Sequence, residues 1–510
     1  MATETTTEQV PLPPMSRVGF FRWMWRQLTS MKTALILLFL LALASVPGSV
    51  IPQRGINPIL VDEWLTDNPT WGPLLDTFGF FDVFAAPWFA AIYILLFISL
   101  IGCVLPRLGV HWRAMRQPPP PAPRYLMRLG GETVEINEQP ALILSRAEKY
   151  LHKDRWRVIR SGESWVAAEK GYLRETGNLV FHFSLILILF AVAYGGLFGW
   201  RGNVIVREGE GFSNTLTQYD AWSGGRLTSP DTLPAFSFTL EDFNVEFSRA
   251  ESQRGAPQLF EADVSVVRPG ESMAANERIE VNYPMTIESA KIFLVGHGYA
   301  PQFIIRDSTG NIVFDDAVVF LPQDGSFTST GVIKVPDATP QLGVRGIFLP
   351  TTALSEERGP FSSFPAPDDP SVFLGAWEGD LGLDSGIPQS VYTLDSESME
   401  QLGLRALRPG ETWELPGGAG SIEFVDFERW ASFQIASDPG KEVALIASIL
   451  AIAGLSLSLF IQRRRVWVKV RPNAATGGTT VEVAGLAKAS GDDPKENVDE
   501  LVKYLIGEAT

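Results

Sequence analysis

The chain has 510 residues, of which 45% are hydrophobic and 20% are charged, and its formal net charge is −16. This is roughly three to four times the length of a typical domain, which excludes a single small enzyme. The negative charge disfavours nucleic acid as a partner, because a phosphate-binding surface needs clustered Lys and Arg. The single cysteine, Cys103, excludes an intramolecular disulfide, a CxxC redox pair and a cysteine-rich metal site.

Apolar residues gather in four runs without a charged side chain, each long enough to cross about 30 Å of hydrocarbon as a helix. An alternative for the first run is a cleaved signal peptide, because Ala42-Leu43-Ala44 resembles a signal-peptidase site. We favour a retained span, since the preceding segment is long and the apolar character continues to Ile51. The sequence therefore predicts transmembrane helices at residues 33–52, 88–105, 178–199 and 442–462.

Charged residues around these runs predict the sidedness of the chain. Lys and Arg gather before the first run, after the second and after the fourth, where Arg463, Arg464 and Arg465 follow directly. Residues 201–440 instead hold 15 Lys and Arg against 35 Asp and Glu. By the positive-inside rule we expect a cell-membrane protein whose segments rich in Lys and Arg lie in the cytoplasm. Residues 1–32, 106–177 and 463–510 are expected to be cytoplasmic, and residues 53–87 and 200–441 extracytoplasmic.

The soluble parts differ in their predicted structure, so the expected fold class is a membrane α+β protein. Residues 106–177 begin with a Pro-rich linker and continue as a β-α-β-β pattern, while residues 463–510 follow a ββα pattern. Two short strands and one helix bury little alone. We therefore expect the tail to pair with residues 124–174 in one cytoplasmic α/β subdomain. Residues 200–441, with many short alternating strands between Gly, Pro, Ser and Thr, predict a large all-β domain.

The chain has only four histidines, and each is weighed as a possible metal-binding or catalytic residue. His111 and His152 lie among Arg and Lys, and we interpret them as solvated. His182 lies near the start of the third span, where snorkelling to the interface is the simple explanation. The alternative is a haem ligand, because the positive amino end of a helix favours the neutral imidazole that iron needs. His297 follows a predicted strand between two glycines, and a loop histidine satisfied by backbone or acids is favoured over a ligand.

Further features of the sequence indicate packing rather than catalysis. Small residues at four-residue spacing, in Ala191-Gly195-Gly199 and in Ala447-Ala451, allow close helix approach, within this bundle or toward another subunit. Cys103 is interpreted as a small buried apolar residue. We find no GxSxG elbow, P-loop or HExxH motif, so the sequence specifies no catalytic centre.

Six short stretches of the sequence stand out together. They are residues 31–35, 45–53 (SVPGSVIPQ), 80–84 (FFDVF), 102–107 (GCVLPR), 171–178 (GYLRETGN) before His182, and 296–301 (GHGYAP). These stretches cover spans, loops and their order over nearly the whole chain, and together they resemble the ResB family of cytochrome c biogenesis proteins.

The resemblance implies a membrane subunit that helps to move haem outward and present it for attachment to the CxxCH motif of apocytochrome c. It implies a tryptophan-rich haem-handling partner (ResC, also called CcsA), apocytochrome c and, as a further expectation, thiol-reducing partners. It places the family's haem-linked histidine of the third span at His182, with haem as a transient cofactor, and leaves His297 a weaker candidate. Many relatives have a His-Ser pair where this chain has Ala85-Ala86, so a role of that histidine is absent here or has moved.

Because the partner's haem loop is missing, a non-catalytic subunit of a haem lyase complex is favoured over a complete enzyme. Two other classes stay open. One is a membrane-anchored binding or scaffold module that handles no haem. The other is a transporter subunit, which the near absence of intramembrane charge disfavours.

Overall fold

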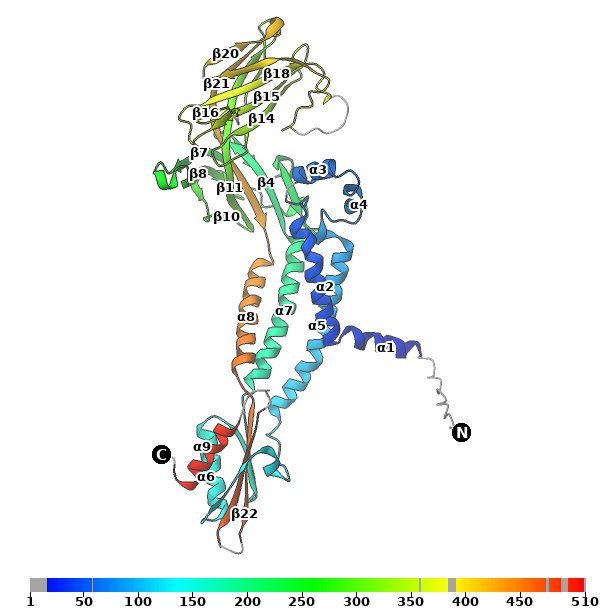
Figure 1. Ribbon diagram of the computed structural model, residues 1–510, viewed down its shortest axis with the longest axis vertical. Coiled ribbons are helices and arrows are strands. Elements are labelled where there is room, and N and C mark those ends of the chain that lie inside the picture. Colours follow the sequence, from blue (N-terminus) through cyan, green and yellow to red (C-terminus); the bar gives the residue numbers. More distant parts are fainter. Residues whose placement is uncertain are drawn as a thin grey trace. The chain divides into compact units, whose positions relative to one another are not determined.

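The computed structural model describes residues 16–56, 58–356, 359–383, 391–473, 477–487 and 494–508. The chain divides into two compact units, residues 1–193 with 440–510 and residues 194–439. The first unit holds the long helices and a small sheet, and the second is built from strands (Figure 1).

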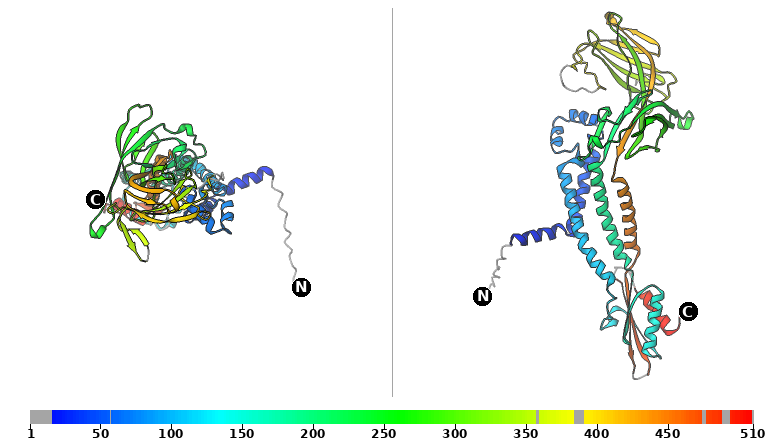
Figure 2. Two further views of the ribbon diagram at one scale, coloured as in Figure 1. Left: turned by 90° about the horizontal axis from the view of Figure 1, so that it is seen from above. Right: turned by 180° about the vertical axis from the view of Figure 1, so that it is seen from behind.

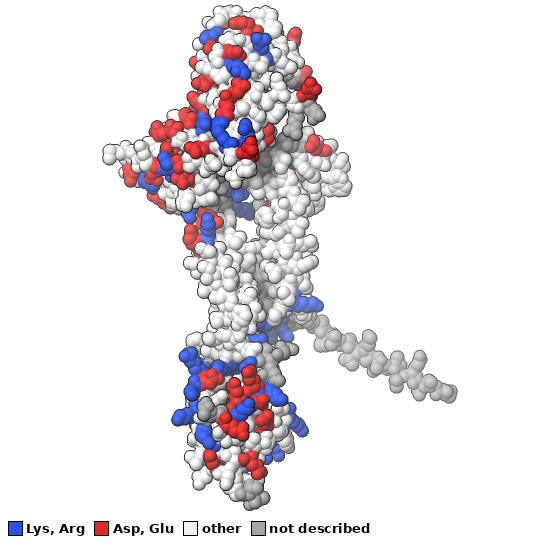
Figure 3. All heavy atoms as spheres, turned by 60° about the vertical axis from the view of Figure 1, so that its left-hand side comes forward, with Lys and Arg blue, Asp and Glu red and all other residues white. Residues whose placement is uncertain are grey.

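Among the described residues, four helices are long and apolar enough to cross a membrane, as the sequence predicted. They are α2 (Met31–Val50), α5 (Pro87–Arg116), α7 (Leu173–Phe198) and α8 (Lys441–Phe460). Shorter α-helices of the described residues before α5 are α1 (Arg17–Leu28), α3 (Pro58–Asp67) and α4 (Gly72–Thr77). On the face shown in Figure 3 the long helices carry almost no charged atoms, while Lys and Arg gather where they approach the small sheet.

Two of these helices extend beyond the apolar runs that predicted them. Helix α5 continues from residue 105 to Arg116, and α7 begins at Leu173 rather than at 178. Arginine, leucine, alanine and methionine are good helix formers, and residues 105–116 hold several of them, so α5 need not end where the apolar run ends. Helix α5 ends where the proline run from Pro118 begins, because proline lacks the backbone N–H and clashes with the preceding turn.

The turn between α1 and α2 is held against α5 by short polar contacts. The Ser99 hydroxyl donates to the Leu28 carbonyl at 2.6 Å, and the Cys103 thiol donates to the Thr29 carbonyl at 2.8 Å. Gly102 lies between them, and a Cβ there would meet the Thr29 side chain at 2.1 Å. Cys103 is thus a half-exposed hydrogen-bond donor, which corrects its interpretation as a buried apolar residue.

Small residues bring α7 and α8 close together at one point. A Cβ at Gly177 would lie 2.6 Å from the Gly454 carbonyl oxygen, and Ala447, Ala451 and Gly454 are buried on α8. Packing within the chain, the simpler interpretation of these residues, is therefore what the structure shows for α8.

The small sheet of the first unit has the antiparallel order β1-β23-β22-β3-β2. Strands β22 and β23 come from the tail, and β22 pairs directly with β3. Helices α6 and α9 lie side by side on one face of this sheet, as both views show (Figures 1 and 2), and their apolar faces form its core. The bounds are β1 (Glu132–Ile136), α6 (Pro140–Lys153), β2 (Arg157–Ser161), β3 (Trp165–Lys170), β22 (Arg464–Pro472), β23 (Thr479–Ala487) and α9 (Lys495–Ile506).

The second unit is organised around two long paired strands, β11 (Ala290–Arg306) and β21 (Ser421–Ser437). One end of the pair packs in a core with the sheet β5-β7-β8-β9, and the other end packs in a second core with the sheet β13-β14-β15-β18-β19. Strand β11 is 17 residues long, whereas the sequence pattern of this region predicts many short strands.

The other strands of this unit have the following bounds. They are β4 (Trp200–Arg207), β5 (Gly211–Ser213), β6 (Ala221–Gly224), β7 (Ser237–Phe247), β8 (Pro257–Val267), β9 (Ala275–Glu280), β10 (Met285–Ile287), β12 (Ile312–Ala317), β13 (Leu321–Pro322), β14 (Ser329–Val335), β15 (Leu342–Leu349), β16 (Thr352–Ser355), β17 (Gly359–Ser362), β18 (Ser371–Glu378), β19 (Glu400–Leu407) and β20 (Glu411–Glu414).

Two short connections between the small sheet and the long helices touch each other at Gly171. This glycine joins β3 to α7 and has a φ of +90°, and a Cβ there would lie 2.0 Å from the Gln462 carbonyl oxygen. Gln462 belongs to the connection from α8 to β22. Only glycine fits here, because both its backbone conformation and the close approach exclude a side chain.

We predict that Gly171→Ala loosens the small sheet much more than Gly130→Ala. Gly130 has a similar φ of +73°, but no other atom lies within 4 Å of the place that an alanine Cβ would take, so alanine there carries only the left-handed backbone cost of about 1–2 kcal/mol. Hydrogen exchange of the β3 and β22 amides in the purified full chain measures the difference. Equal protection in the two variants would show that the Gly171 contact is unimportant.

Candidate functional site

His182 lies on α7 with one ring nitrogen committed to the helix backbone. Its Nδ1 is 2.7 Å from the carbonyl oxygen of Asn178, one turn earlier, and a carbonyl can only accept, so Nδ1 carries the proton. In the neutral ring the lone pair then lies on Nε2. The ring is half-buried and meets Phe181 edge-on at 5.2 Å between centroids.

This arrangement meets the requirement for an axial ligand to haem iron. A metal-binding histidine commonly donates its other N–H to a carbonyl, which fixes the tautomer and the ring orientation. His182 has this donor bond, and the residues next to it in the sequence, Phe181 and Phe183, are apolar. The tautomer that this bond sets therefore leaves Nε2 with the lone pair that a metal ion needs.

His182 lies too far from the amino end of its helix for the charge there to act on it, contrary to the expectation from the sequence. Helix α7 begins at Leu173, which places His182 in the third turn, and the charge effect of a helix end falls off within the first turn. The hydrogen bond to Asn178 takes its place as the feature that sets up the imidazole.

A polar pocket of about 340 Å³ lies one turn from His182, at the ends of α7 and α8 next to the small sheet. Asn178, whose backbone accepts the His182 proton, also lines this pocket. The lining residues are Arg174, Glu175, Asn178, Ser458 and Arg463.

A buried group of charges forms one wall of the pocket. Arg463 is 6% exposed and donates to Glu169, which is 2% exposed, with 2.5 Å between Nε and Oε1. Arg463 also pairs with Glu175, while the Tyr172 hydroxyl donates to Glu169 at 2.7 Å and Arg465 pairs with it at 3.1 Å. Burial alone would raise the pKa of Glu169, but the hydrogen bonds from Tyr172 and Arg463 outweigh it and leave the pKa below its ordinary value.

His111 belongs to this neighbourhood, which corrects its interpretation as a solvated residue. Its side chain is 14% exposed, with Nδ1 3.6 Å from the Glu175 carboxylate and Nε2 3.1 Å from the Thr176 hydroxyl. The reason is the extra length of α5, which carries His111 alongside the start of α7. His152 is 57% exposed, as expected.

We predict that Glu169→Gln destabilises the junction of the small sheet and the long helices at neutral pH. The substitution removes one of the two negative charges that neutralise the buried Arg463. Breaking a buried ion pair in this way lowers the free energy of unfolding by about 3–5 kcal/mol. Because the folded pKa of Glu169 is depressed, the wild type should lose this stability as pH falls below the ordinary glutamate pKa of about 4.3, and the variant should lack that loss.

Hydrogen exchange of β3 and β22 between pH 3 and pH 7 measures this dependence. Glu163→Gln, a change in the turn between β2 and β3, is the matched control and should behave as wild type. An identical pH profile in Glu169→Gln and wild type would contradict the assigned role of the Arg463–Glu169 pair.

His297 lies within strand β11, not in a loop, and its surroundings are aromatic. Its ring stacks on Phe327 at 4.5 Å and lies 4.9 Å from Phe260 and 5.2 Å from Phe243, between centroids. Its Nε2 is buried and has no hydrogen-bond partner among the described residues. Burial lowers the pKa of His297 to about 4, with a further contribution from the positive charge of Arg429.

The flanking glycines of His297 serve packing instead of a turn. The register against β21 shifts between Leu294 and Gly296, and a Cβ at Gly298 would lie 2.4 Å from the Trp430 ring. An iron could reach His297 Nε2 only if the surrounding phenyl rings moved aside. The two candidate histidines also lie in different units of the chain.

We predict that His297→Phe keeps or raises the stability of the second unit at pH 7, because it removes a buried polar atom without a partner among the described residues. Between about pH 6.5 and pH 4 the histidine of the unfolded chain is protonated while His297 of the folded chain is not, so the stability of wild type should fall as the pH is lowered over that range. The variant should lack this contribution to the pH dependence of stability. Hydrogen exchange of the β11 amides tests this, with the exposed His152→Gln as control. A large loss of protection at pH 7 would instead indicate a polar partner or ligand for His297.

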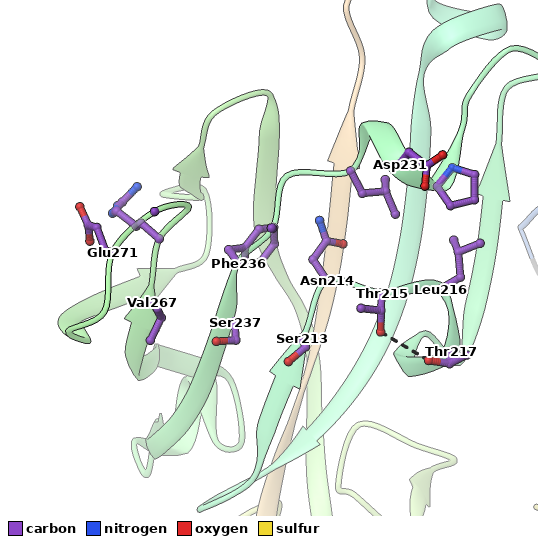
Figure 4. Close-up of a pocket in the computed structure, with 15 residues that line it drawn as sticks. Ser213, Asn214, Thr215, Leu216, Thr217, Asp231, Phe236, Ser237, Val267 and Glu271 are labelled. Atoms are coloured by element: carbon purple, nitrogen blue, oxygen red, sulfur yellow. Dashed lines mark hydrogen bonds between the residues drawn. The ribbon is translucent and has the colours of Figure 1, made fainter.

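A second pocket, at the edge strand β5 of the second unit, has a volume of about 570 Å³ (Figure 4). Its central amide, Asn214, donates to the Pro234 carbonyl at 2.8 Å and accepts from the Tyr219 hydroxyl at 2.5 Å. Because the Asn214 amide already makes these two hydrogen bonds within the protein, it is not available to recognise a ligand. Over the described part of the chain, no cluster of three His, Cys, Asp or Glu side chains could hold a metal ion.

The pocket beside His182 was not found by inspection of the sequence. Its acids and arginines come from residues 169–175 and from 463–465, almost 300 positions apart. In the sequence, the arginines at 463–465 indicated sidedness and residues 171–178 carried the family resemblance, and neither pattern indicated a pocket. One signal was present, the Arg174-Asn178-His182 spacing, which places three polar side chains on one face of a helix.

Comparison with known proteins gives a consistent result over nearly the full length. The model of the ResB-like family matches residues 31–499. Two proteins named cytochrome c biogenesis protein CcsB, from Prochlorococcus marinus strains MIT 9313 and NATL1A, are each 24% identical to this chain. The first match covers 88% of this chain and 90% of the relative, and the second covers 94% and 97%. Cytochrome c biogenesis protein Ccs1 of Rhodomonas salina is 25% identical, over 88% of this chain and 90% of the relative.

Proposed function

Because the chain belongs to the ResB-like family, we propose that it is a membrane subunit of a cytochrome c maturation complex that helps to carry haem across the membrane and present it to apocytochrome c. The relatives' names support cytochrome c maturation, and the four apolar helices support a membrane location. The observation that carries the haem part is the His182 Nδ1 bond to Asn178, which leaves Nε2 for iron.

In this proposal haem is cargo, and the chain's own residues hold it for a short time. His182 Nε2 supplies one axial ligand, the Asn178 carbonyl keeps the imidazole in the ligating tautomer, and Phe181 limits ring rotation. A ligand on a membrane helix keeps water from the iron, which suits a carrier that passes haem onward and performs no chemistry on it.

The expected sidedness completes the proposal. With the termini and the small sheet in the cytoplasm, His182 would lie near the inner face, where haem arrives, and the β-rich unit would lie outside. There it would position apocytochrome c and the ResC-like partner. That partner would supply the outer haem-handling groups.

A membrane-anchored scaffold that handles no haem is the second candidate. The enclosed His297 and the satisfied amide of the pocket at β5 favour it, because neither offers the β-rich unit a haem site of its own. Under this alternative, His182 would only pack at the interface.

We predict that the complex purified with its haem-handling partner carries haem, and that His182→Ala lowers its Soret absorbance several-fold. Added imidazole should restore part of it, because free imidazole can take the place of the missing side chain. His152→Ala, an exposed histidine of the small sheet, is the control and should leave the absorbance unchanged.

Equal haem in wild type and His182→Ala would refute the ligand assignment. Normal levels of membrane c-type cytochromes after deletion of the gene would refute the role in maturation itself.

A further inference from the structure

We propose that the pocket between α7 and α8 binds the propionate carboxylates of haem, with Arg174 as their principal donor. This inference rests on the proposed function, because it names how the same cargo is oriented at His182. It is carried by the spacing, the pairing and the burial of the residues that line the pocket.

The first observation is alignment along one helix face. Arg174, Asn178 and His182 follow each other at four-residue spacing, so they lie one above the other on α7. Each step rises about 6 Å, which separates the backbones of Arg174 and His182 by about 12 Å. The His182 ring shortens this gap, because it reaches back toward the amino end of the helix and contacts the Asn178 carbonyl. A planar ligand bound to iron at His182, with acidic groups on one edge, can therefore reach the pocket.

The second observation is an unmatched positive charge. Arg463 and Arg465 share the carboxylates of Glu169 and Glu175. Arg174 lines the same pocket, and its guanidinium makes no ion pair or hydrogen bond with any described residue. The arginine left over is therefore the one on the His182 face. A carboxylate is the natural partner for a guanidinium, which can hold it through two parallel hydrogen bonds.

The third observation concerns the other walls. The Asn178 amide and the Ser458 hydroxyl also line the pocket and can donate to a carboxylate. Arg463 is almost completely buried and is fixed by its two glutamates, so it forms a rigid wall whose charge Glu169 and Glu175 already match, and Arg174 is the cation that is left for a ligand. The close contact of Gly177 with Gly454 holds α7 and α8 together next to these residues.

An anion at this depth has two sources, a haem propionate and a lipid headgroup. We favour the propionate because the pocket adjoins the ligating histidine and has a buried arginine in its wall. Exposed arginines of α5, such as Arg113, are accessible to lipid without such a pocket.

The test compares binding of iron protoporphyrin IX and of its dimethyl ester, which lacks the carboxylate charge. The full chain is reconstituted with its partner in nanodiscs of phosphatidylcholine, with and without phosphatidylglycerol, and binding is followed by Soret absorbance. Variants are Arg174→Gln, the conservative Arg174→Lys, the matched control Arg113→Gln, and His182→Ala. The ratio of the two affinities is compared between variants, so that the greater solubility of the ester in lipid cancels.

We expect wild type and Arg113→Gln to prefer haem over the ester by about tenfold, the size of one charge-assisted hydrogen bond. Arg174→Gln should lose most of this preference and Arg174→Lys should retain part of it. His182→Ala should weaken the binding of both porphyrins.

Three results would overturn the proposal, and they are distinguishable. If His182-dependent binding is present but Arg174→Gln keeps the full preference, the pocket assignment fails and the proposed function stands. If Arg174→Gln alters only the response to phosphatidylglycerol, the pocket is a lipid site. If neither porphyrin binds in a His182-dependent way, the proposed function fails together with this inference.

Discussion

One hydrogen bond, from His182 Nδ1 to the carbonyl of Asn178, underlies the proposed haem site. An imidazole on a membrane helix can rotate, change tautomer or turn toward the interface, and each of these would remove the lone pair that a metal needs. The backbone carbonyl one turn earlier holds the proton on one nitrogen and so defines the role of the other. Because the acceptor is main chain, the arrangement depends on α7 being helical at this point and on no other side chain.

The position of that helix is set by its junction with the small sheet. Gly171 lets the connection from β3 to α7 pass close to the connection from α8 to β22. Arg463, in the second connection, also pairs with Glu169 on β3 and with Glu175 on α7. A buried ion pair contributes little net stability but strongly disfavours other arrangements that would leave a charge unpaired. The junction therefore fixes where the start of α7 lies relative to the end of α8, and with it the polar pocket beside His182.

Local signals in the sequence predicted much of the architecture and little of the site. Charge-free runs indicated the four apolar helices, and alternation with turn residues indicated a β-rich region, because both depend on nearby residues. The length of α5 was missed, since residues such as Arg107, Arg113 and Ala114 form helix as readily outside a membrane as within it. The motif around His297 was assigned to a loop because its glycines suggested a turn, whereas they accommodate Trp430 and a shift in register. The pairing of Arg463 with Glu169 lay out of reach, because it joins residues that only the fold brings together.

The central claim is that His182 itself bonds to iron, and replacing the ligand atom tests it most directly. In a Cys103→Ser background, His182→Cys would place a sulfur on α7 at this position. If His182 is the axial ligand, the haem of the purified complex should change its electron paramagnetic resonance and Soret spectra from an imidazole to a thiolate type. Haem with spectra identical to those of the Cys103→Ser parent would contradict the claim.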